Sequence, residues 1–222
     1  MKKIFLSLIA AVFTVAAMAQ QTPSKPKAEG EASKEVTALR LANSLIKYGY
    51  AQQKALPLID ALQIMASTQT QEFKGEKAEG ESASKEAELS FDVKKIIEDA
   101  KDYADGDANL IAMITKIENE SNAPHRGAVG GPCRQVETLY ANRYITYNCS
   151  FVANRTAEVA VSGDGDTDLD LYIYDSNGNL IASDADYSDD CYVRWTPRWT
   201  GRYIIKVVNN GGVANRFVLL TN

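Results

Sequence analysis

The sequence contains a single histidine, His125, among its 222 residues. His125 stands between Pro124 and Arg126 in a loop-like stretch, which is typical of a solvated side chain rather than a catalytic base. No glycine-rich loop in the context of a nucleotide-binding fold is present. These absences argue against histidine-assisted hydrolysis and nucleotide chemistry, and we expect a protein that is not an enzyme.

Long hydrophobic runs are absent except near the N-terminus. Two lysines precede an apolar run from Ile4 to Ala17, and a small-x-small pattern ends at Ala19. This arrangement predicts a secretory signal peptide over residues 1–19, cleaved near Ala19. The run is short for a bilayer, so we expect no transmembrane anchor after cleavage and a secreted or periplasmic location in a bacterium.

Positive charge is in the minority, with 24 Lys and Arg against 29 Asp and Glu and a formal net charge of −5. Nucleic-acid binding depends on cationic side chains that neutralise phosphates. We therefore expect no nucleic-acid partner. Residues 161–190 are the most acidic stretch, because they contain nine Asp and neither Lys nor Arg.

Apolar residues recur at helical spacing over residues 34–119 and predict four helices in two hairpins. Two hairpins can pack as a four-helix unit. Gly49 is expected to end the first helix, and the Gly/Ser/Glu/Lys-rich residues 67–87 predict a flexible linker. The other expected segments are a disordered leader over 20–33, helices near 34–48, 52–66, 91–104 and 107–119, and a Pro- and Gly-containing linker over 120–135.

The hydrophobic period changes to two in residues 136–222. Seven or eight short apolar stretches follow one another there, separated by turn residues and with no helix between them. This pattern is typical of an antiparallel β-sandwich. The predicted fold class is therefore α + β in separate domains, with helical hairpins first and the sandwich second.

Four aspartates at alternate positions suggest a metal site at the rim of this sandwich. In a strand, alternate side chains share a face about 6.6 Å apart, and a row of carboxylates repels itself without a cation. Ca²⁺ prefers such oxygen ligands, whereas Leu169 at the position that needs glycine excludes an EF-hand. The alternative is a solvated acidic loop. The candidate ligands are Asp164, Asp166, Asp168 and Asp170, joined by Asp186 or Asp189 from the facing loop.

Three cysteines permit one disulfide in an exported protein, which leaves one thiol over. Cys149 shares strand parity with Phe151, and Cys191 shares it with Val193. If both sets face the core, a Cys149–Cys191 disulfide links two strands. A Cys133–Cys149 pair is the alternative.

Two aromatic residues in predicted turns are candidate ligand-binding groups. Tyr187 lies in the acidic loop and Trp199 follows Pro197. Exposed rings there can stack on sugars or on a protein partner. Alternatively, Trp199 closes the end of the sandwich. Trp195 alternates with Val193 and is expected in the core.

Three separated motifs resemble the bacterial pre-peptidase C-terminal domain over about residues 136–222. They are Val159–Gly163, Asp168–Asp175 and Thr200–Val207. The resemblance implies a jelly-roll-like β-sandwich on a secreted protein; some family members bind calcium and some bind collagen. A peptidase domain usually precedes this module, and none is recognisable here. The helical half resembles no known family.

These observations predict a secreted, non-catalytic binding or interaction module with a calcium-stabilised sandwich. Its expected partner is a protein or polysaccharide of the cell envelope or the extracellular matrix. The alternatives are an accessory or hydrolytic domain of an envelope enzyme system, and a purely structural envelope protein. A flat aromatic patch beside the Asp cluster would favour binding, whereas a pocket with convergent carboxylates and a water path would favour an enzyme.

Overall fold

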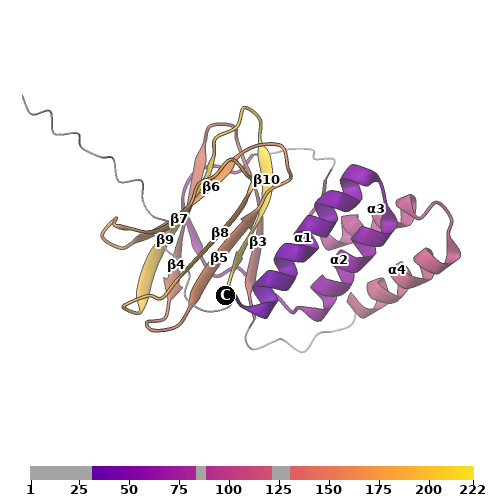
Figure 1. Cartoon of the computed structure of the whole chain (residues 1–222), viewed down its shortest axis with the longest axis horizontal. Coiled ribbons are helices and arrows are strands. Elements are labelled where there is room, and N and C mark those ends of the chain that lie inside the picture. Colours follow the sequence, from indigo (N-terminus) through magenta and orange to yellow (C-terminus); the bar gives the residue numbers. More distant parts are fainter. Residues whose placement is uncertain (1–31, 84–88, 122–130) are drawn as a thin grey trace, which may run out of the picture.

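The structure is a computed structural model that describes residues 32–83, 89–121 and 131–222. This part of the chain forms three layers (Figure 1). One layer is a group of four helices, and the other two are five-stranded sheets. The predicted signal peptide, nearly all of the predicted leader, His125 and the centre of the second linker lie outside the described residues. Among the described residues, no helix is long and apolar enough to cross a membrane.

The four helices confirm the two predicted hairpins, with one correction. The first helix continues through Gly49, which we expected to end it. A Cβ at this position would lie 2.5 Å from Leu58 Cδ2, so glycine allows the first two helices to pack closely. Ser33 caps the first helix and Asp92 caps the third through their side-chain oxygens. The helices are α1 (Lys34–Gln52), α2 (Ala55–Ser67), α3 (Val93–Tyr103) and α4 (Ala108–Ser121).

The two sheets pack face to face and confirm the predicted β-sandwich. Apart from the parallel β1–β3 pair, neighbouring strands are antiparallel. We call the sheet next to the helices the inner sheet and the other the outer sheet. The inner sheet has the order β1 (Gln71–Glu72), β3 (Cys133–Leu139), β10 (Asn215–Thr221), β5 (Ala157–Ser162) and β8 (Asp190–Trp195). The outer sheet has the order β2 (Glu76–Glu79), β4 (Tyr144–Phe151), β9 (Gly201–Asn209), β6 (Leu169–Asp175) and β7 (Leu180–Asp184).

Part of the predicted flexible linker 67–87 belongs to the sandwich. Strand β1 pairs with β3 and strand β2 pairs with β4, so this segment adds an edge strand to each sheet. Lys77 of β2 also forms a 2.9 Å ion pair with Glu137 of β3 across the sandwich. The segment therefore connects the helical half to both sheets, and it is not a free tether.

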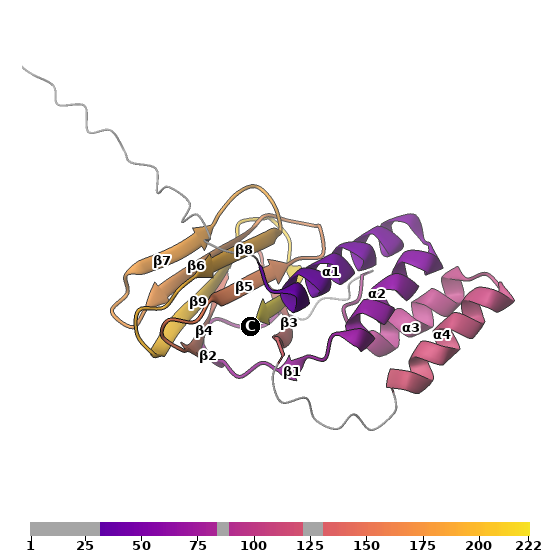
Figure 2. The same ribbon diagram turned by 60° about the horizontal axis from the view of Figure 1, so that its bottom comes forward.

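The helices cover the inner sheet and share a core with it. The buried helix residues form one cluster with Ala160, Val218 and Leu220 of that sheet. Figures 1 and 2 both show α1 between the sandwich and α2. Contacts at seven-residue spacing fix one face of α1 to the sheet, because seven residues are close to two helical turns. They are Ser33 N–H to Glu158 Oε1 at 2.9 Å, the Arg40 guanidinium 4.6 Å from the Tyr192 ring centroid, and Lys47 Nζ to Asp189 Oδ1 at 3.2 Å.

Candidate binding face of the sandwich

The two acidic stretches predicted to form a metal site do lie side by side. The backbone N–H of Gly163 donates to Asp189 O at 2.8 Å, and that of Leu169 donates to Ser188 O at 3.1 Å. However, strand β6 begins only at Leu169, so Asp170 is the one predicted ligand within it. The other three alternating aspartates lie in the preceding loop and do not share a strand face.

Several carboxylate oxygens of this acidic end already have protein partners. Asp164 Oδ2 accepts from the backbone of Arg216 at 2.9 Å, and Asp186 Oδ1 accepts from that of Ser188 at 3.1 Å. Asp189 also pairs with Lys47 of α1, as described above. Within residues 32–83, 89–121 and 131–222, no group of three His, Cys, Asp or Glu side chains is arranged to hold a metal ion.

Asp168 is the carboxylate with the least favourable surroundings at this end. Desolvation is the main cause that raises its pKa above the ordinary value, and the charge of Asp170 adds to the shift. Its Oδ1 is buried and has no hydrogen-bond partner among the described residues. Removing its charge should relieve this unfavourable interaction.

The predicted Cys149–Cys191 disulfide is not formed, and all three cysteines are free thiols. Cys149 lies opposite Tyr203 of β9, whereas the Cys191 thiol donates to Leu169 O at 3.0 Å. Leu169 lies opposite Asn209, six residues further along β9, or about 20 Å away. A disulfide needs Cα atoms about 4.4–6.8 Å apart. Cys149 and Cys191 do share the inward parity that the sequence indicates, but they lie at opposite ends of the sandwich core.

The two predicted ligand-binding aromatics also lie at opposite ends of the sandwich. Tyr187 precedes β8 and is fully exposed, with 100% relative accessibility. Trp199 follows β8 and stacks on Tyr203, with ring centroids 6.0 Å apart and planes 17° from parallel. A strand of six residues separates them, so they cannot contact one small ligand together. Trp195 is buried, as expected from the sequence.

The outward side of the outer sheet carries a different aromatic group, which we call the tyrosine face. Every second residue of β9 is buried in the core between the sheets. Lys206 and the other residues of the opposite parity therefore point outward. The strand register then places side chains from β4, β9 and β6 in cross-strand rows on this side. The rows are Tyr144, Val208 and Asp170; Thr146, Lys206 and Tyr172; and Asn148, Ile204 and Tyr174.

Contacts within the tyrosine face hold its rings in place. Lys206 Nζ lies 4.2 Å from the centroid of the Tyr144 ring, as a cation–π pair. Tyr172 and Tyr174 stack with centroids 6.4 Å apart and planes 26° from parallel. The Tyr172 hydroxyl donates to Asp170 Oδ2 at 2.8 Å. Burial, and then this hydrogen bond, raise the pKa of Tyr172 to about 12, so its hydroxyl stays a donor at neutral pH.

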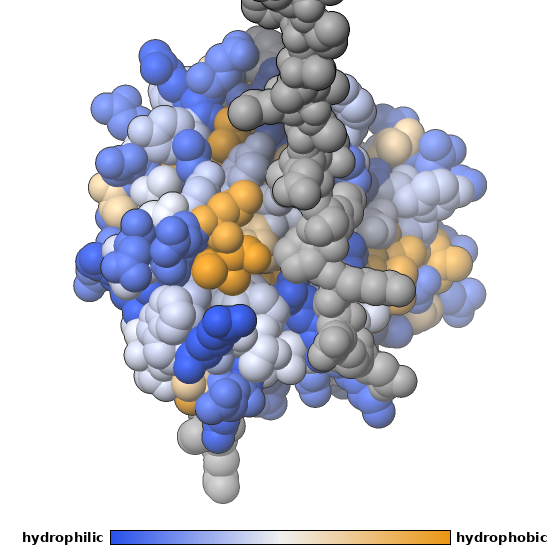
Figure 3. Space-filling model, turned by 60° about the vertical axis from the view of Figure 1, so that its left-hand side comes forward, coloured by the Kyte–Doolittle hydropathy of each residue, from blue (hydrophilic) through white to orange (hydrophobic). Residues whose placement is uncertain are grey.

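Polar groups dominate the surroundings of this face. The side of the sandwich that comes forward in Figure 3 is largely hydrophilic and shows small, separate hydrophobic groups, one of them near its centre. Leu180 of β7, which lies opposite Tyr174, is 45% exposed. The outer sheet therefore combines aromatic rings with neighbouring hydrogen-bonding groups. Figure 3 shows no broad hydrophobic patch on this side of the molecule.

No model of a known protein family matches the chain, and no curated protein matches its sequence. Among solved structures, it is similar to the pre-peptidase C-terminal domain of a Bacillus anthracis collagenase, with 10% identity and a TM-score of 0.36 over 40% of this chain and 87% of that one. It is also similar to PliG, a periplasmic inhibitor of g-type lysozyme from Aeromonas hydrophila, with 13% identity and a TM-score of 0.35 over 44% of this chain and 91% of that one. These similarities are too distant to bear on function.

The tyrosine face was missed at the sequence level, although a signal for it exists. Leu169, Leu171 and Ile173 alternate towards the core, so the residues between them must point outward. At the sequence level we drew only a metal-site prediction from this alternation, because we considered the aspartates and not the tyrosines. The same parity places Tyr172 and Tyr174 beside Asp170, and it would have identified both rings.

Proposed function

We propose that the chain is an exported, non-catalytic binding module whose tyrosine face binds a polysaccharide. The observation that carries this proposal is the row arrangement of Tyr144, Tyr172 and Tyr174 on one side of a regular sheet. Export rests on the N-terminal sequence pattern.

The chemistry of this face suits sugar rings. A pyranose presents a C–H surface that can stack on an aromatic ring, and hydroxyl groups at its edge. Tyr172 and Tyr174 supply neighbouring rings, while Lys206 supplies donors beside them. Because the contacts above already restrict these side chains, binding loses less conformational entropy than it would with free rings.

A polysaccharide suits this face better than a tightly bound protein. The centres of protein–protein interfaces are depleted of charged residues. Here Lys206 and Asp170 lie among the tyrosines. Charged and hydroxyl-bearing groups between aromatic rings match the alternating apolar and polar surface of a glycan.

Affinity electrophoresis tests the proposal. The full chain is run in native gels that contain β-glucan, xylan, mannan or alginate, beside an inert reference protein. We expect retardation by at least one polysaccharide, and Tyr172→Ala and Tyr174→Ala should each weaken binding by about tenfold, since an aromatic contact contributes about 0.5–1.5 kcal/mol beyond the area that it buries.

Tyr187→Ala is the matched control, because it removes an exposed tyrosine that belongs to the acidic loop and not to the tyrosine face. It should bind as the wild type does. Loss of binding in Tyr187→Ala but not in the two face variants would overturn the assignment and favour the acidic loop. Retardation by none of the polysaccharides, together with capture of a purified envelope protein by the face, would favour a protein partner instead.

A further inference from the structure

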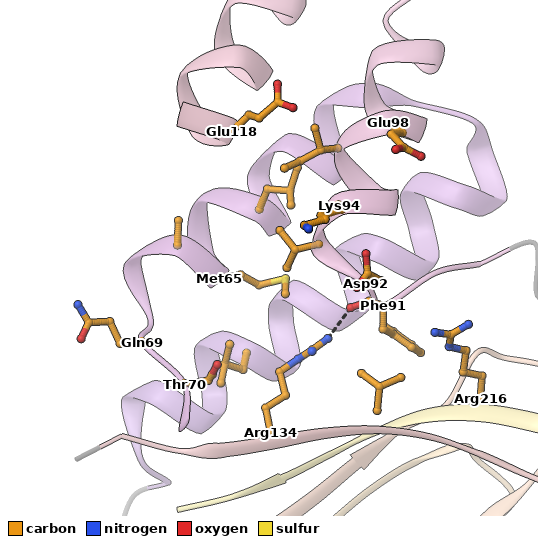
Figure 4. Close-up of a pocket in the computed structure, with 16 residues that line it drawn as sticks. Met65, Gln69, Thr70, Phe91, Asp92, Lys94, Glu98, Glu118, Arg134 and Arg216 are labelled. Atoms are coloured by element: carbon orange, nitrogen blue, oxygen red, sulfur yellow. Dashed lines mark hydrogen bonds between the residues drawn. The ribbon is translucent and has the colours of Figure 1, made fainter. Parts of the chain in front are cut away.

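A cavity of about 740 Å³ lies between the helices and the inner sheet, away from the tyrosine face. Its size falls within the range of small-molecule sites, about 300–1,000 Å³. Residues from α1, α2 and α3 and the outward side of β3 and β10 surround it (Figure 4). Its apolar lining includes Leu39, Leu62, Met65, Phe91, Ile97 and Val136.

Two arginines project from the inner sheet to one end of this cavity. Arg134 comes from β3 and Arg216 from β10, and Figure 4 shows their side chains on either side of Phe91. Arg134 Nη2 donates to the carbonyl oxygen of Phe91 at 2.7 Å. Arg216 Nε is buried and has no hydrogen-bond partner among the described residues. Desolvation is the main cause that lowers the pKa of Arg134; the charge of Asp92 opposes this shift, and that of Arg216 adds to it.

The nearby carboxylates form no ion pair with these guanidinium groups among the described residues, although the charge of Asp92 acts on Arg134. Asp92 Oδ1 accepts from the backbone of Lys95 as the cap of α3, and Glu118 pairs with Lys101 at 2.6 Å. Figure 4 shows Glu98 and Glu118 on the helices, across the cavity from the arginines.

We propose that this cavity binds a small amphipathic carboxylate, a molecule with one carboxylate group and an apolar chain. Its carboxylate lies at the end formed by Arg134 and Arg216, and its chain lies along Leu39, Leu62 and Met65 of the helices. A guanidinium presents paired N–H donors whose geometry matches a carboxylate. Bound there, the anion supplies an acceptor for Arg216 Nε and a negative charge that pairs with both guanidinium groups.

The apolar lining distinguishes this ligand from a free inorganic anion. An inorganic phosphate would satisfy the arginines but leave most of the hydrophobic wall without contacts. Each buried CH₂ group contributes about 0.8 kcal/mol, so a chain of several carbons adds substantial affinity. We therefore expect that binding needs both parts of the molecule.

Isothermal titration of the full chain, after removal of bound lipid on a hydrophobic resin, tests this proposal. The probes are decanoate, decanol and inorganic phosphate. We expect decanoate to bind at least about tenfold more tightly than decanol, because a hydrogen bond to a charged group contributes about 1.5–3 kcal/mol. Equal binding of decanoate and decanol, or phosphate binding as tight as that of decanoate, would overturn the proposal.

Arg216→Leu is the decisive variant, since its guanidinium Nε is unpaired in the described structure. It should weaken decanoate binding by about tenfold or more without lowering the melting temperature. Arg143→Leu, which replaces an exposed arginine in the turn before β4, should bind decanoate as the wild type does. Unchanged affinity in Arg216→Leu would reject the site, and this variant stays informative even if Arg134→Leu does not fold.

Discussion

Replacing Glu158 with glutamine should destabilise the whole molecule, because this residue connects the helices to the sandwich. Glu158 lies in β5 and is only 1% exposed. Its carboxylate accepts the backbone N–H of Ser33 at 2.9 Å (Oε1) and 3.2 Å (Oε2), at the start of α1. Its Oε1 also lies 3.3 Å from Nε of Arg194, whose side chain is 9% exposed.

The expected loss follows from the charge that remains. Glu158→Gln keeps the shape of the side chain but leaves the Arg194 guanidinium buried beside a neutral amide. Removing one partner of a buried ion pair costs about 3–5 kcal/mol. For a protein of this size, about 2–4 °C of melting temperature corresponds to each kcal/mol, so the midpoint should fall by roughly 6–20 °C.

Urea unfolding, monitored by both far-ultraviolet circular dichroism and tryptophan fluorescence, measures this loss. The double variant Glu158→Gln with Arg194→Met should recover most of the stability, because neither charge then stays buried alone. Glu72→Gln, at an exposed position in β1, should change stability by less than about 0.5 kcal/mol. A loss below about 1 kcal/mol in Glu158→Gln would refute the reasoning.

Two further predictions concern carboxylates of the outer sheet and the acidic end. The side chain of Asn179 is the main cause that lowers the pKa of Asp175, with help from nearby backbone N–H groups. A carboxylate with a lowered folded pKa stabilises the protein above its unfolded pKa, and this stability disappears as the pH falls through the folded value. Asp175→Asn should therefore flatten the acid limb of a stability–pH profile below about pH 4, and an unchanged limb would contradict this. Calcium binding stays a prediction from the sequence: millimolar Ca²⁺ should raise the melting midpoint of the wild type over that in chelator, but not that of Asp168→Asn, and an unchanged wild-type midpoint rejects it.

The sequence predicted the type of most elements because their periodicity is strong. It could not reveal β1 and β2, since these short edge strands are polar and owe their conformation to pairing with β3 and β4. The residues of β2 are all exposed and show no alternation that a single-sequence reading can detect. Gly49 was misjudged for a related reason, because close packing on Leu58 outweighs the low helix propensity of glycine.

The packing of the helices on the inner sheet has a signal in the sequence of β10. In β10, Phe217 to Leu220 is a continuous apolar run, and all of its residues are buried. A strand with one solvated face alternates, whereas a strand covered on both faces reads as a continuous apolar run. This run therefore predicts a further layer over the strand, which the structure supplies as α1.

The candidate sites were harder to predict, because they depend on which face of each sheet is covered. The outward side of the inner sheet presents Arg134, Arg216 and Glu158, whose charges would be solvated in an isolated sandwich. The helices cover these side chains. This packing creates both the contact between Glu158 and the start of α1 and the cavity. No pattern within β3 or β10 alone indicates that two arginines from these strands share one cavity.

Both sides of the sandwich depend structurally on the segment that precedes residue 133. On the inner sheet, Val218 and Leu220 belong to the helix core, so a fragment that begins near residue 133 would expose them to water. Such a fragment would also lose β1 and β2, the edge strands of both sheets, and leave unpaired backbone groups that favour aggregation. The tyrosine face depends on the register of β4, β9 and β6, and β2 covers the edge of β4. The tyrosine face also contacts β2 directly, because the Tyr144 hydroxyl donates to Glu79 Oε2 at 3.1 Å. We therefore infer that the segment before residue 133 is a structural requirement of the proposed binding face, so an isolated sandwich is the wrong fragment on which to test that proposal.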